Sequence, residues 1–460
     1  MSRRVSARAA VALVADPGGF HELPVPDGTY APDGPLSWEG YDDARARATA
    51  RTGESESVVC GTAVLGGTRA VLISFEFGFL GGSLGERTGD RLEAAHAYAR
   101  ERRLPVVALV ATGGSRMQEG MRALTQLQRV ARESALTRAA GLPQLAVVRD
   151  PVTGGGWATL GAGADVILAL PSAQIGFAGS RVRPPDADPS AYTAEAQFAV
   201  GAIDAVVPEP DLRETLADWL ALLTDGVGVA ESGTTAPGEG GVGLPAPPPH
   251  ALGRTDLPGT GWDAVVRARA AERPRATAYL DAYFTRRVTV SGDRAGGTDD
   301  GMLCGFGTHD GRTVAFAAQC GTATRPAGYR TAARLIRLAG RLNLPVLTLV
   351  DTPGAANDAA AERSGAGAAI ADLFAAVAEC PVPVTTLVIG EGGSGGALAL
   401  AAPGNTWATP DSYFSVIAPE PAAAILKRPS EDVRRTADQL RPRPQDLVDL
   451  GVVRGIVPGS

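Results

Sequence analysis

The sequence predicts an α/β protein built from two copies of one domain, and three observations support this. Short apolar runs alternate with longer stretches of helical periodicity along most of the 460 residues. Several segments recur after an offset of roughly 240 residues, and a stretch rich in glycine and proline separates the two copies. Alternating strands and helices are typical of α/β domains, in which helices cover both faces of the sheet.

The internal repeat is clearest where an apolar run follows a proline. Residues 105–111 read PVVALVA, and residues 345–351, which lie 240 positions later, read PVLTLVD. Three further matches keep the same order along the chain, at 58–73 with 302–317, at 143–148 with 383–388 and at 201–209 with 451–459. Four collinear matches with a nearly constant offset indicate a tandem duplication.

The first copy is expected to begin with a strand hairpin and to continue with alternating helices and strands. The hairpin joins strands at 58–65 and 69–75 through Gly66 and Gly67. After it we expect a helix at 91–103, a strand at 105–111, a helix at 119–140, a strand at 143–149, a helix at 156–164 and a strand at 165–170. The run at 105–111 has no polar face, so this strand should be buried on both sides.

Composition divides the chain into four parts. Residues 1–57 form an N-terminal extension with loop-like sequence at 17–36, for which the sequence suggests no function. Residues 58–225 and 260–460 are the two expected domains. Residues 226–259, rich in glycine, proline, serine and threonine, are expected to be a linker between them.

The composition also argues against several classes of function. A net charge of -7 gives no general affinity for nucleic acid, and no apolar run is long enough to span a membrane, so we expect a cytoplasmic protein. We expect no metal site, because the cysteines and histidines are scattered without ligand spacing, at Cys60, Cys304, Cys320, Cys380, His21, His96, His250 and His309. With Lys427 as the single lysine, phosphate contacts must come from arginine or from backbone amides.

The stretch VIGEGGSGGALAL at 388–400 is the densest glycine cluster. Its spacing fits the dinucleotide-binding pattern G-x-G-x-x-G at Gly390, Gly392 and Gly395. The aligned stretch of the first copy, 148–157, lacks this pattern, which disfavours nicotinamide or flavin binding. What both copies share is a strand, adjacent glycines and then a helix that opens with small residues.

Such paired glycine turns can serve as oxyanion holes. Backbone N–H groups at the start of a helix, left uncovered by glycine, can stabilise an oxygen that gains negative charge. Each copy adds a second glycine-bearing strand end, Gly113-Gly114 and Pro353-Gly354. Two such sites would suit a reaction that passes charge between two carbonyl-like oxygens. The alternative is that the glycines only permit tight turns and close packing of helix on strand.

Long motifs in both copies resemble one enzyme family. Those at 75–121, 150–160 and 175–182 resemble the β subunit of bacterial acetyl-CoA carboxylase carboxyltransferase. Motifs in the second copy resemble the α subunit, at 261–284, 292–294, 328–355, 389–400 and 413–426. The resemblance implies an α/β fold made of two crotonase-like domains, each a ββα spiral, in a tandem duplication.

The resemblance also implies a reaction and its site. The family moves a carboxyl group from carboxybiotin on a carrier protein to the α-carbon of an acyl-CoA, for example from acetyl-CoA to malonyl-CoA for fatty acid or polyketide biosynthesis. One oxyanion hole would serve the thioester enolate and the other the biotin ureido oxygen, with catalytic amides at Gly154, Gly155, Gly396 and Ala397. Substrate-binding residues implied by the resemblance are Gly113, Gly114, Ser115, Arg116, Gly354 and Gly395. Arg116 would be either a charged contact on the CoA side or a structural residue. Biotin itself takes the α-proton in this family, which fits the shortage of catalytic side chains.

The sequence departs from the family pattern in ways that leave the acyl substrate open. The four-cysteine zinc ribbon of the β subunit is missing, the two subunits are fused, and Gln319-Cys320-Gly321-Thr322 replaces a basic K-G-R segment. No biotin-attachment motif surrounds Lys427, so we expect a separate biotin carboxyl carrier protein and biotin carboxylase as partners, and a homo-oligomer. Two alternatives remain, a biotin-independent decarboxylase of malonyl- or carboxyacyl-thioesters and a non-catalytic scaffold that binds CoA or the carrier.

Overall fold

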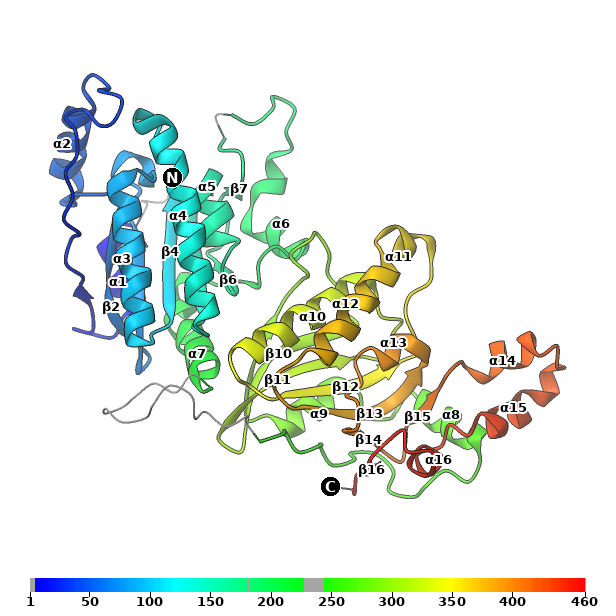
Figure 1. The fold of residues 1–460 in the computed structure, drawn as a ribbon. Helices are drawn as coiled ribbons and strands as arrows, with labels where there is room; N and C mark the ends of the chain where they lie inside the picture. The colour runs from blue at the N-terminus through cyan, green and yellow to red at the C-terminus, as the bar shows by residue number, and fades with distance from the viewer. Residues whose placement is uncertain (1–4, 181, 227–243, 460) are drawn as a thin grey trace. The chain divides into compact units, whose positions relative to one another are not determined.

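The chain divides into two compact units, Met1–Thr234 and Thr235–Ser460, which are described separately (Figure 1). The computed structural model describes residues 5–180, 182–226 and 244–459. Most of the expected linker, 227–243, lies outside the described residues. No helix among the described residues is both long enough and apolar enough to cross a membrane.

The first unit is built on an eight-stranded sheet with the order β1-β2-β3-β4-β5-β6-β8, in which β7 also pairs with β5. The strands are β1 His21–Glu22, β2 Val58–Leu65, β3 Thr68–Phe75, β4 Val106–Thr112, β5 Gln144–Thr153, β6 Val166–Ala169, β7 Ile175–Gly176 and β8 Ala205–Val206. The helices are α1 Ala7–Val14, α2 Tyr41–Thr52, α3 Glu86–Arg102, α4 Gly120–Ala139, α5 Gly154–Gly156, α6 Ala194–Ala199 and α7 Leu212–Thr224. β2 and β3 form the antiparallel hairpin, and β3 to β6 run parallel.

The second unit repeats this plan with the order β16-β14-β13-β12-β11-β10-β9, and β15 pairs with β13. Its strands are β9 Arg286–Val290, β10 Met302–His309, β11 Arg312–Gln319, β12 Val346–Thr352, β13 Val384–Gly393, β14 Thr406–Ala408, β15 Tyr413–Ser415 and β16 Gly455–Ile456. Its helices are α8 Gly261–Arg269, α9 Ala276–Tyr283, α10 Pro326–Arg341, α11 Ala359–Arg363, α12 Ala366–Ala378, α13 Ser394–Leu398, α14 Pro419–Ile425, α15 Val433–Leu440 and α16 Pro444–Asp449. The helices α10 and α12 lie side by side over the sheet (Figure 1).

Irregularities of the two sheets recur at matching positions. The pairing of β4 with β5 shifts register between Val110 and Thr112, and that of β12 with β13 shifts between Val350 and Thr352. An isolated parallel bridge joins Leu84 to Ser115 in the first unit, and another joins Thr324 to Ala355 in the second. Each pair of positions is separated by the 240 residues of the sequence repeat, so the predicted duplication of an α/β domain is confirmed in three dimensions.

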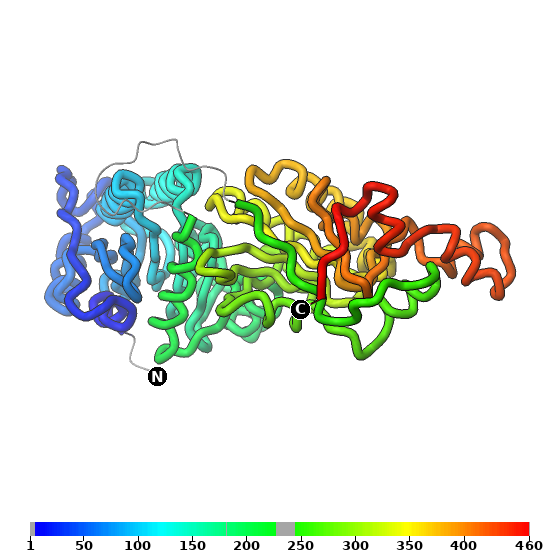
Figure 2. Tube along the Cα trace, turned by 90° about the horizontal axis from the view of Figure 1, so that it is seen from below, coloured from blue at the N-terminus to red at the C-terminus, as the bar shows by residue number. Residues whose placement is uncertain are grey.

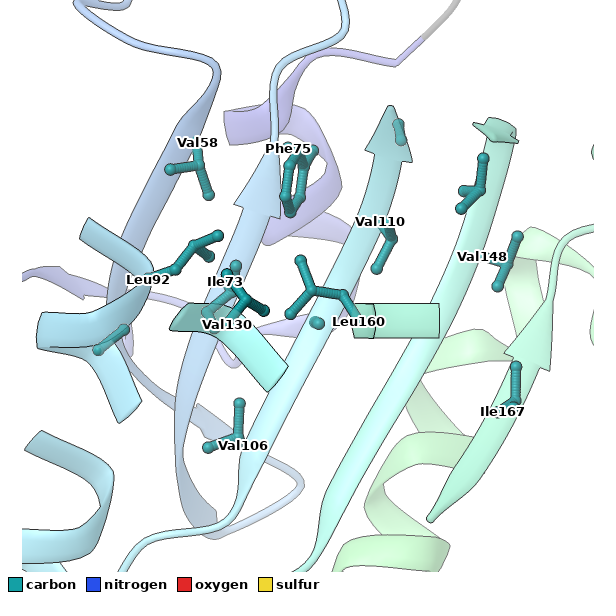
Figure 3. Packing of buried hydrophobic residues seen from close by; sticks show 14 of the residues in the cluster. Val58, Ile73, Phe75, Leu92, Val106, Val110, Val130, Val148, Leu160 and Ile167 are labelled. Atoms are coloured by element: carbon teal, nitrogen blue, oxygen red, sulfur yellow. The ribbon is translucent and has the colours of Figure 1, made fainter. Parts of the chain in front are cut away.

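The core of the first unit explains why β4 lacks a polar face. All seven residues of β4 are buried, as expected for a parallel strand covered on both sides. Leu92 of α3 and Val130 of α4 pack toward Ile73 and Val110 on the sheet (Figure 3). Burying a side chain of this size stabilises the fold by about 1.5–3 kcal/mol, so this layer fixes the ends of the strands from which the site is built.

The structure differs from the expected elements in three places, one of which is the short strand β1 inside the stretch 17–36 that was expected to be loop-like. The helix expected at 156–164 is a single turn, α5, followed by a π-helical turn at Trp157–Gly161. Residues 244–258, expected to belong to a linker, have little regular secondary structure and run along the second unit near its C-terminal strand (Figure 2). Ala246 and Ala251 are buried in the core of that unit, so small apolar side chains inside a proline-rich stretch fix this segment.

Candidate active site

The glycine turn of the first unit begins where β5 ends. Gly154 has a backbone φ of +61°, and Gly155 and Gly156 follow as the first turn of α5. The Gly154 N–H donates to the Phe177 carbonyl oxygen at 2.9 Å, whereas the Gly155 N–H donates to no atom of the described chain. The structure therefore does not support the prediction that Gly154 supplies a catalytic amide, because the carbonyl of Phe177, the residue after β7, already uses that donor. For Gly155 the prediction stands as made, because its amide has no partner among the described residues.

The matching turn of the second unit opens α13. Ser394 and Gly395 are exposed, while Gly396 and Ala397 are buried. A methyl group on Gly396 would lie 2.4 Å from the Ala355 backbone nitrogen, so this position accepts only glycine, whereas a methyl group on Gly395 would meet nothing within 4 Å. The Gly396 N–H donates to no atom within residues 244–459. Bare backbone with an available amide is therefore present in both units.

The second glycine segment of each unit lies against the first. A Cβ built on Gly154 would lie 3.3 Å from the Gly114 Cα, and one built on Gly354 would lie 3.4 Å from the Gly393 carbonyl oxygen. The structure thus brings the predicted residues of each unit together, with Gly113 exposed and Ser115 half-buried at the same turn.

Two threonines hold these strand ends. The Gly114 N–H donates to Thr112 Oγ1 at 3.0 Å, and the Gly354 N–H donates to Thr352 Oγ1 at 3.1 Å. These amides shape the turn from within and are not available to a ligand. Sequence analysis missed both threonines, although identical residues 240 positions apart in the aligned repeat were a usable signal.

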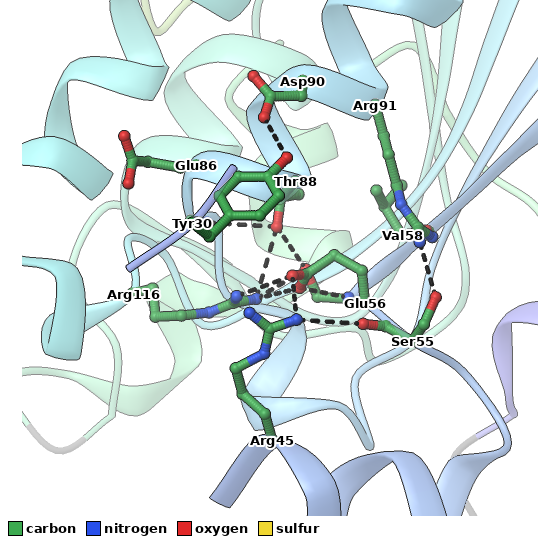
Figure 4. Close-up of polar contacts among 12 residues, drawn as sticks. Tyr30, Arg45, Ser55, Glu56, Val58, Glu86, Thr88, Asp90, Arg91 and Arg116 are labelled. Atoms are coloured by element: carbon green, nitrogen blue, oxygen red, sulfur yellow. Dashed lines mark hydrogen bonds and ion pairs between the residues drawn. The ribbon is translucent and has the colours of Figure 1, made fainter. Parts of the chain in front are cut away.

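Arg116 is buried inside the first unit and bonded to other protein groups. Its side chain is fully buried and donates to Glu56 Oε2 at 3.1 Å (Figure 4). It also donates to the Tyr41 hydroxyl at 3.1 Å and to the Ser83 carbonyl oxygen at 2.7 Å. Burial alone would raise the pKa of Glu56, but its attraction to the Arg116 guanidinium and the hydrogen bonds between them lower it. An ion pair with the N-terminal extension occupies the guanidinium, which favours the structural role of Arg116 over a contact with CoA.

An acidic side chain fixes the strand that leads into the glycine stretch of the second unit. Asp351, fully buried at the end of β12, accepts hydrogen bonds from Arg273 and from the backbone N–H of Glu391. Arg273 also donates to the Ile389 carbonyl oxygen at 3.3 Å. Asp351 and Arg273 therefore fix the backbone of β13 at Glu391 and Ile389, just before Gly392.

Side chains with reactive chemistry are scarce around these turns. Burial raises the pKa of the Cys60 and Cys304 thiols to about 12, so neither is a thiolate near neutral pH. Within residues 5–180, 182–226 and 244–459, no three His, Cys, Asp or Glu side chains are grouped so that they could hold a metal ion. A cavity of about 620 Å³ in the first unit lies at Tyr30, Arg87 and Arg91, away from the glycine turn. The chemistry these turns offer is that of backbone amides.

Comparison with known proteins agrees with this architecture. Residues 33–205 match the carboxyl transferase domain family, and residues 258–460 match the acetyl co-enzyme A carboxylase carboxyltransferase-like family. The acetyl-coenzyme A carboxylase carboxyl transferase subunits beta/alpha of Salinispora arenicola are 38% identical over 478 aligned positions, which cover 99% of this chain and 82% of that protein.

The chain belongs to the acetyl-CoA carboxylase carboxyltransferase family. A probable biotin-dependent acyl-coenzyme A carboxylase beta3 subunit of Mycobacterium bovis is 34% identical, over 91% of this chain and 83% of that protein. Among solved structures, transcarboxylase 12S superposes with a TM-score of 0.79 at 20% identity, over 98% of this chain and 86% of that one. The predicted pair of crotonase-like domains is confirmed, and both copies of this carboxyltransferase carry the fold.

Proposed function

We propose that this carboxyltransferase moves a carboxyl group from carboxybiotin on a separate carrier protein to the α-carbon of an acyl-CoA. Acetyl-CoA, giving malonyl-CoA, or a close relative is the proposed substrate. The observation that carries the proposal is the pair of uncovered amides, Gly155 and Gly396, each at the first turn of a helix in one of two duplicated units. Family membership over the whole chain supports it.

The two turns fit the oxygens of the reaction. Removing the α-proton of a thioester places negative charge on its carbonyl oxygen, and a hydrogen-bond donor aimed at that oxygen lowers the barrier. When bound, carboxybiotin supplies the carboxyl group as carbon dioxide and a ring nitrogen that takes the proton. The chain's own contribution is to bind and orient, with one turn facing the thioester oxygen and the other the ureido oxygen. No acidic or basic side chain is needed for this role.

The proposed partners are a biotin carboxyl carrier protein, a biotin carboxylase and a second copy of this chain, in the cytoplasm. Large apolar side chains are exposed beside the glycine turns. Phe177 and Val416 follow β7 and β15 and are 75% and 76% exposed. Met117, in the 3-10 turn before α4, and Met121, in the first turn of α4, are 70% and 67% exposed. Exposed apolar surface of this kind marks a protein contact, so we propose that these faces are covered in a homo-oligomer.

Transfer from a carboxylated carrier tests the proposal. The purified protein is incubated with carboxylated carrier protein and a panel of acyl-CoA and acyl-carrier thioesters, and carboxylated products are measured by mass. Carboxylation of at least one short acyl-CoA is expected. Release of carbon dioxide from malonyl-CoA without biotin would instead identify a decarboxylase. Binding of CoA with no turnover in either direction would identify a scaffold.

A further inference from the structure

The Gly396 carbonyl oxygen is held in an unusual way. In the short helix α13 the Ala399 N–H donates to the Gly395 carbonyl and the Leu400 N–H donates to the Ala397 carbonyl, so the backbone bypasses the Gly396 oxygen. Two side chains take its place as donors, Gln319 Nε2 at 3.3 Å and the Tyr329 hydroxyl at 3.1 Å. An end-of-helix carbonyl that would otherwise lack a partner is thus satisfied by residues from β11 and α10.

Holding this oxygen fixes the amides of the turn. A peptide unit is planar, so the Gly396 carbonyl and the Ala397 N–H move together, and the Gly396 N–H is separated from that plane by only the φ and ψ bonds of Gly396. Hydrogen bonds to the carbonyl also polarise the peptide and strengthen its N–H as a donor. Gln319 and Tyr329 therefore control both the direction and the strength of the candidate oxyanion donors.

The two donors are buried and connected to the other glycine segment. Both side chains are fully buried, and burial raises the pKa of the Tyr329 hydroxyl, which therefore stays protonated and able to donate. Gln319 Nε2 also donates to Thr324 Oγ1 at 3.1 Å, and Thr324 Oγ1 lies 3.5 Å from Thr352 Oγ1, which holds the Gly354 amide. A single polar network therefore joins Gly354 to Gly396.

One polar atom of the Gln319 side chain is left without a hydrogen-bond partner in this position. Its Oε1 atom is buried and has no hydrogen-bond partner among the described residues. A buried amide oxygen without a partner destabilises a fold by about 1–3 kcal/mol. The Nε2 atom of the same amide donates both to Thr324 Oγ1 and to the Gly396 carbonyl. The side chain is therefore oriented so that Nε2 is bonded to the turn, although Oε1 is left without a partner.

The first unit lacks this arrangement. The residue equivalent to Gln319 is Phe75, at the end of β3, and the residue 240 positions before Tyr329 is Gly89, so neither side chain can donate a hydrogen bond. The aligned carbonyl, that of Gly156, therefore has no counterpart of this pair of donors. The two turns share a backbone shape but differ in how firmly the side chains hold it.

We propose that Tyr329 and Gln319 are positioning residues, which hold the Gly396 carbonyl so that the first turn of α13 presents its amides to a developing negative charge. This inference rests on the proposed function. It predicts a defect in turnover and not in acyl-CoA binding, because the lost interaction orients groups that act most strongly on the charged state.

The test compares Tyr329→Phe and Gln319→Leu with the control Tyr283→Phe. Tyr283 is another buried tyrosine of the second unit, and its hydroxyl donates to the Pro247 carbonyl oxygen at 2.8 Å, away from α13. We expect Tyr329→Phe and Gln319→Leu each to lower kcat by about 10-fold to 100-fold with little change in KM for the acyl-CoA, and Tyr283→Phe to leave kcat unchanged at a similar thermal midpoint. Equal kcat losses in the Tyr329 and Tyr283 variants would overturn the proposal.

Hydrogen exchange separates this proposal from the proposed function. We expect the peptide containing residues 390–400 to exchange faster in Tyr329→Phe than in Tyr283→Phe, whether or not the protein transfers carboxyl groups. Unchanged exchange in Tyr329→Phe would refute the positioning role. Wild-type protein with no activity on any thioester, together with faster exchange in Tyr329→Phe, would refute the carboxyltransferase function and retain the role of Tyr329 in the turn.

Discussion

Ser394, the first residue of α13, has a backbone φ of +59°, close to the +61° of Gly154, the first residue of α5. The two residues are 240 positions apart, at equivalent points of the duplicated domain. A left-handed conformation costs a residue with a side chain about 1–2 kcal/mol, and glycine does not have this cost. The turn shape is therefore common to both copies even where glycine is not, which indicates that the geometry of the turn matters more than its residue type.

Exchanging these residue types should shift stability in opposite directions. Ser394→Gly is expected to stabilise the second unit by about 1 kcal/mol through relief of backbone strain, because Ser394 is exposed and no hydrogen bond of its side chain is at stake among the described residues. Gly154→Ser is expected to destabilise the first unit by about 1–2 kcal/mol, since its new Cβ would also lie close to the Gly114 Cα. Urea unfolding of each variant measures both changes. A loss of stability in Ser394→Gly would contradict the explanation.

Gly395→Ala should separate folding from ligand approach. A methyl group at Gly395 meets no atom within 4 Å and the residue is exposed, so the fold should tolerate the change. The methyl group would stand in the space before the Gly396 amide, and we expect kcat/KM to fall by at least about 10-fold, the loss typical of a misplaced reacting group. Gly367→Ala is the matched control, because Gly367 in α12 is equally exposed and equally unobstructed. Equal activity in the two variants would show that no ligand approaches Gly395.

The duplication, the order of strands and the glycine turns were predictable because the sequence contains periodic apolar runs and repeated segments at these positions. The apolar run at 105–111 and its copy at 345–351 became β4 and β12 with the expected burial. The role of Arg116 was not predictable, because its partner Glu56 lies 60 residues away in a segment without a repeat or motif. The roles of Gln319 and Tyr329 were likewise not predictable. Both side chains donate hydrogen bonds to the Gly396 carbonyl, and this contact exists only in the folded chain.

The buried pair of Arg116 and Glu56 should act on stability and not on substrate binding. Arg116→Met leaves the Glu56 carboxylate buried without its main partner, and we expect a loss of about 3–5 kcal/mol. Arg122→Met is the control, because Arg122 pairs with Glu86 at the surface, where such pairs are worth about 1 kcal/mol or less. Urea unfolding gives the two losses, and KM for the acyl-CoA is measured on the fraction that remains folded. A raised KM for the acyl-CoA in folded Arg116→Met would instead support a contact between Arg116 and CoA.

His96 should make the first unit sensitive to mild acid. Burial, and then repulsion from Arg100, lower the pKa of His96 from 6.5 to about 4, with its Nδ1 3.1 Å from Thr137 Oγ1. Between these two values the unfolded chain binds a proton that the folded chain does not, so stability is complete above pH 6.5 and falls as the pH is lowered toward 4. From pH 7 to pH 5 the loss of stability from this group is about 2 kcal/mol.

His96→Gln should flatten that part of the stability profile, measured as the urea midpoint of unfolding at each pH, while His250→Gln, at an exposed histidine, should leave it unchanged. Parallel profiles for wild type and His96→Gln would contradict this assignment and would place the acid sensitivity elsewhere.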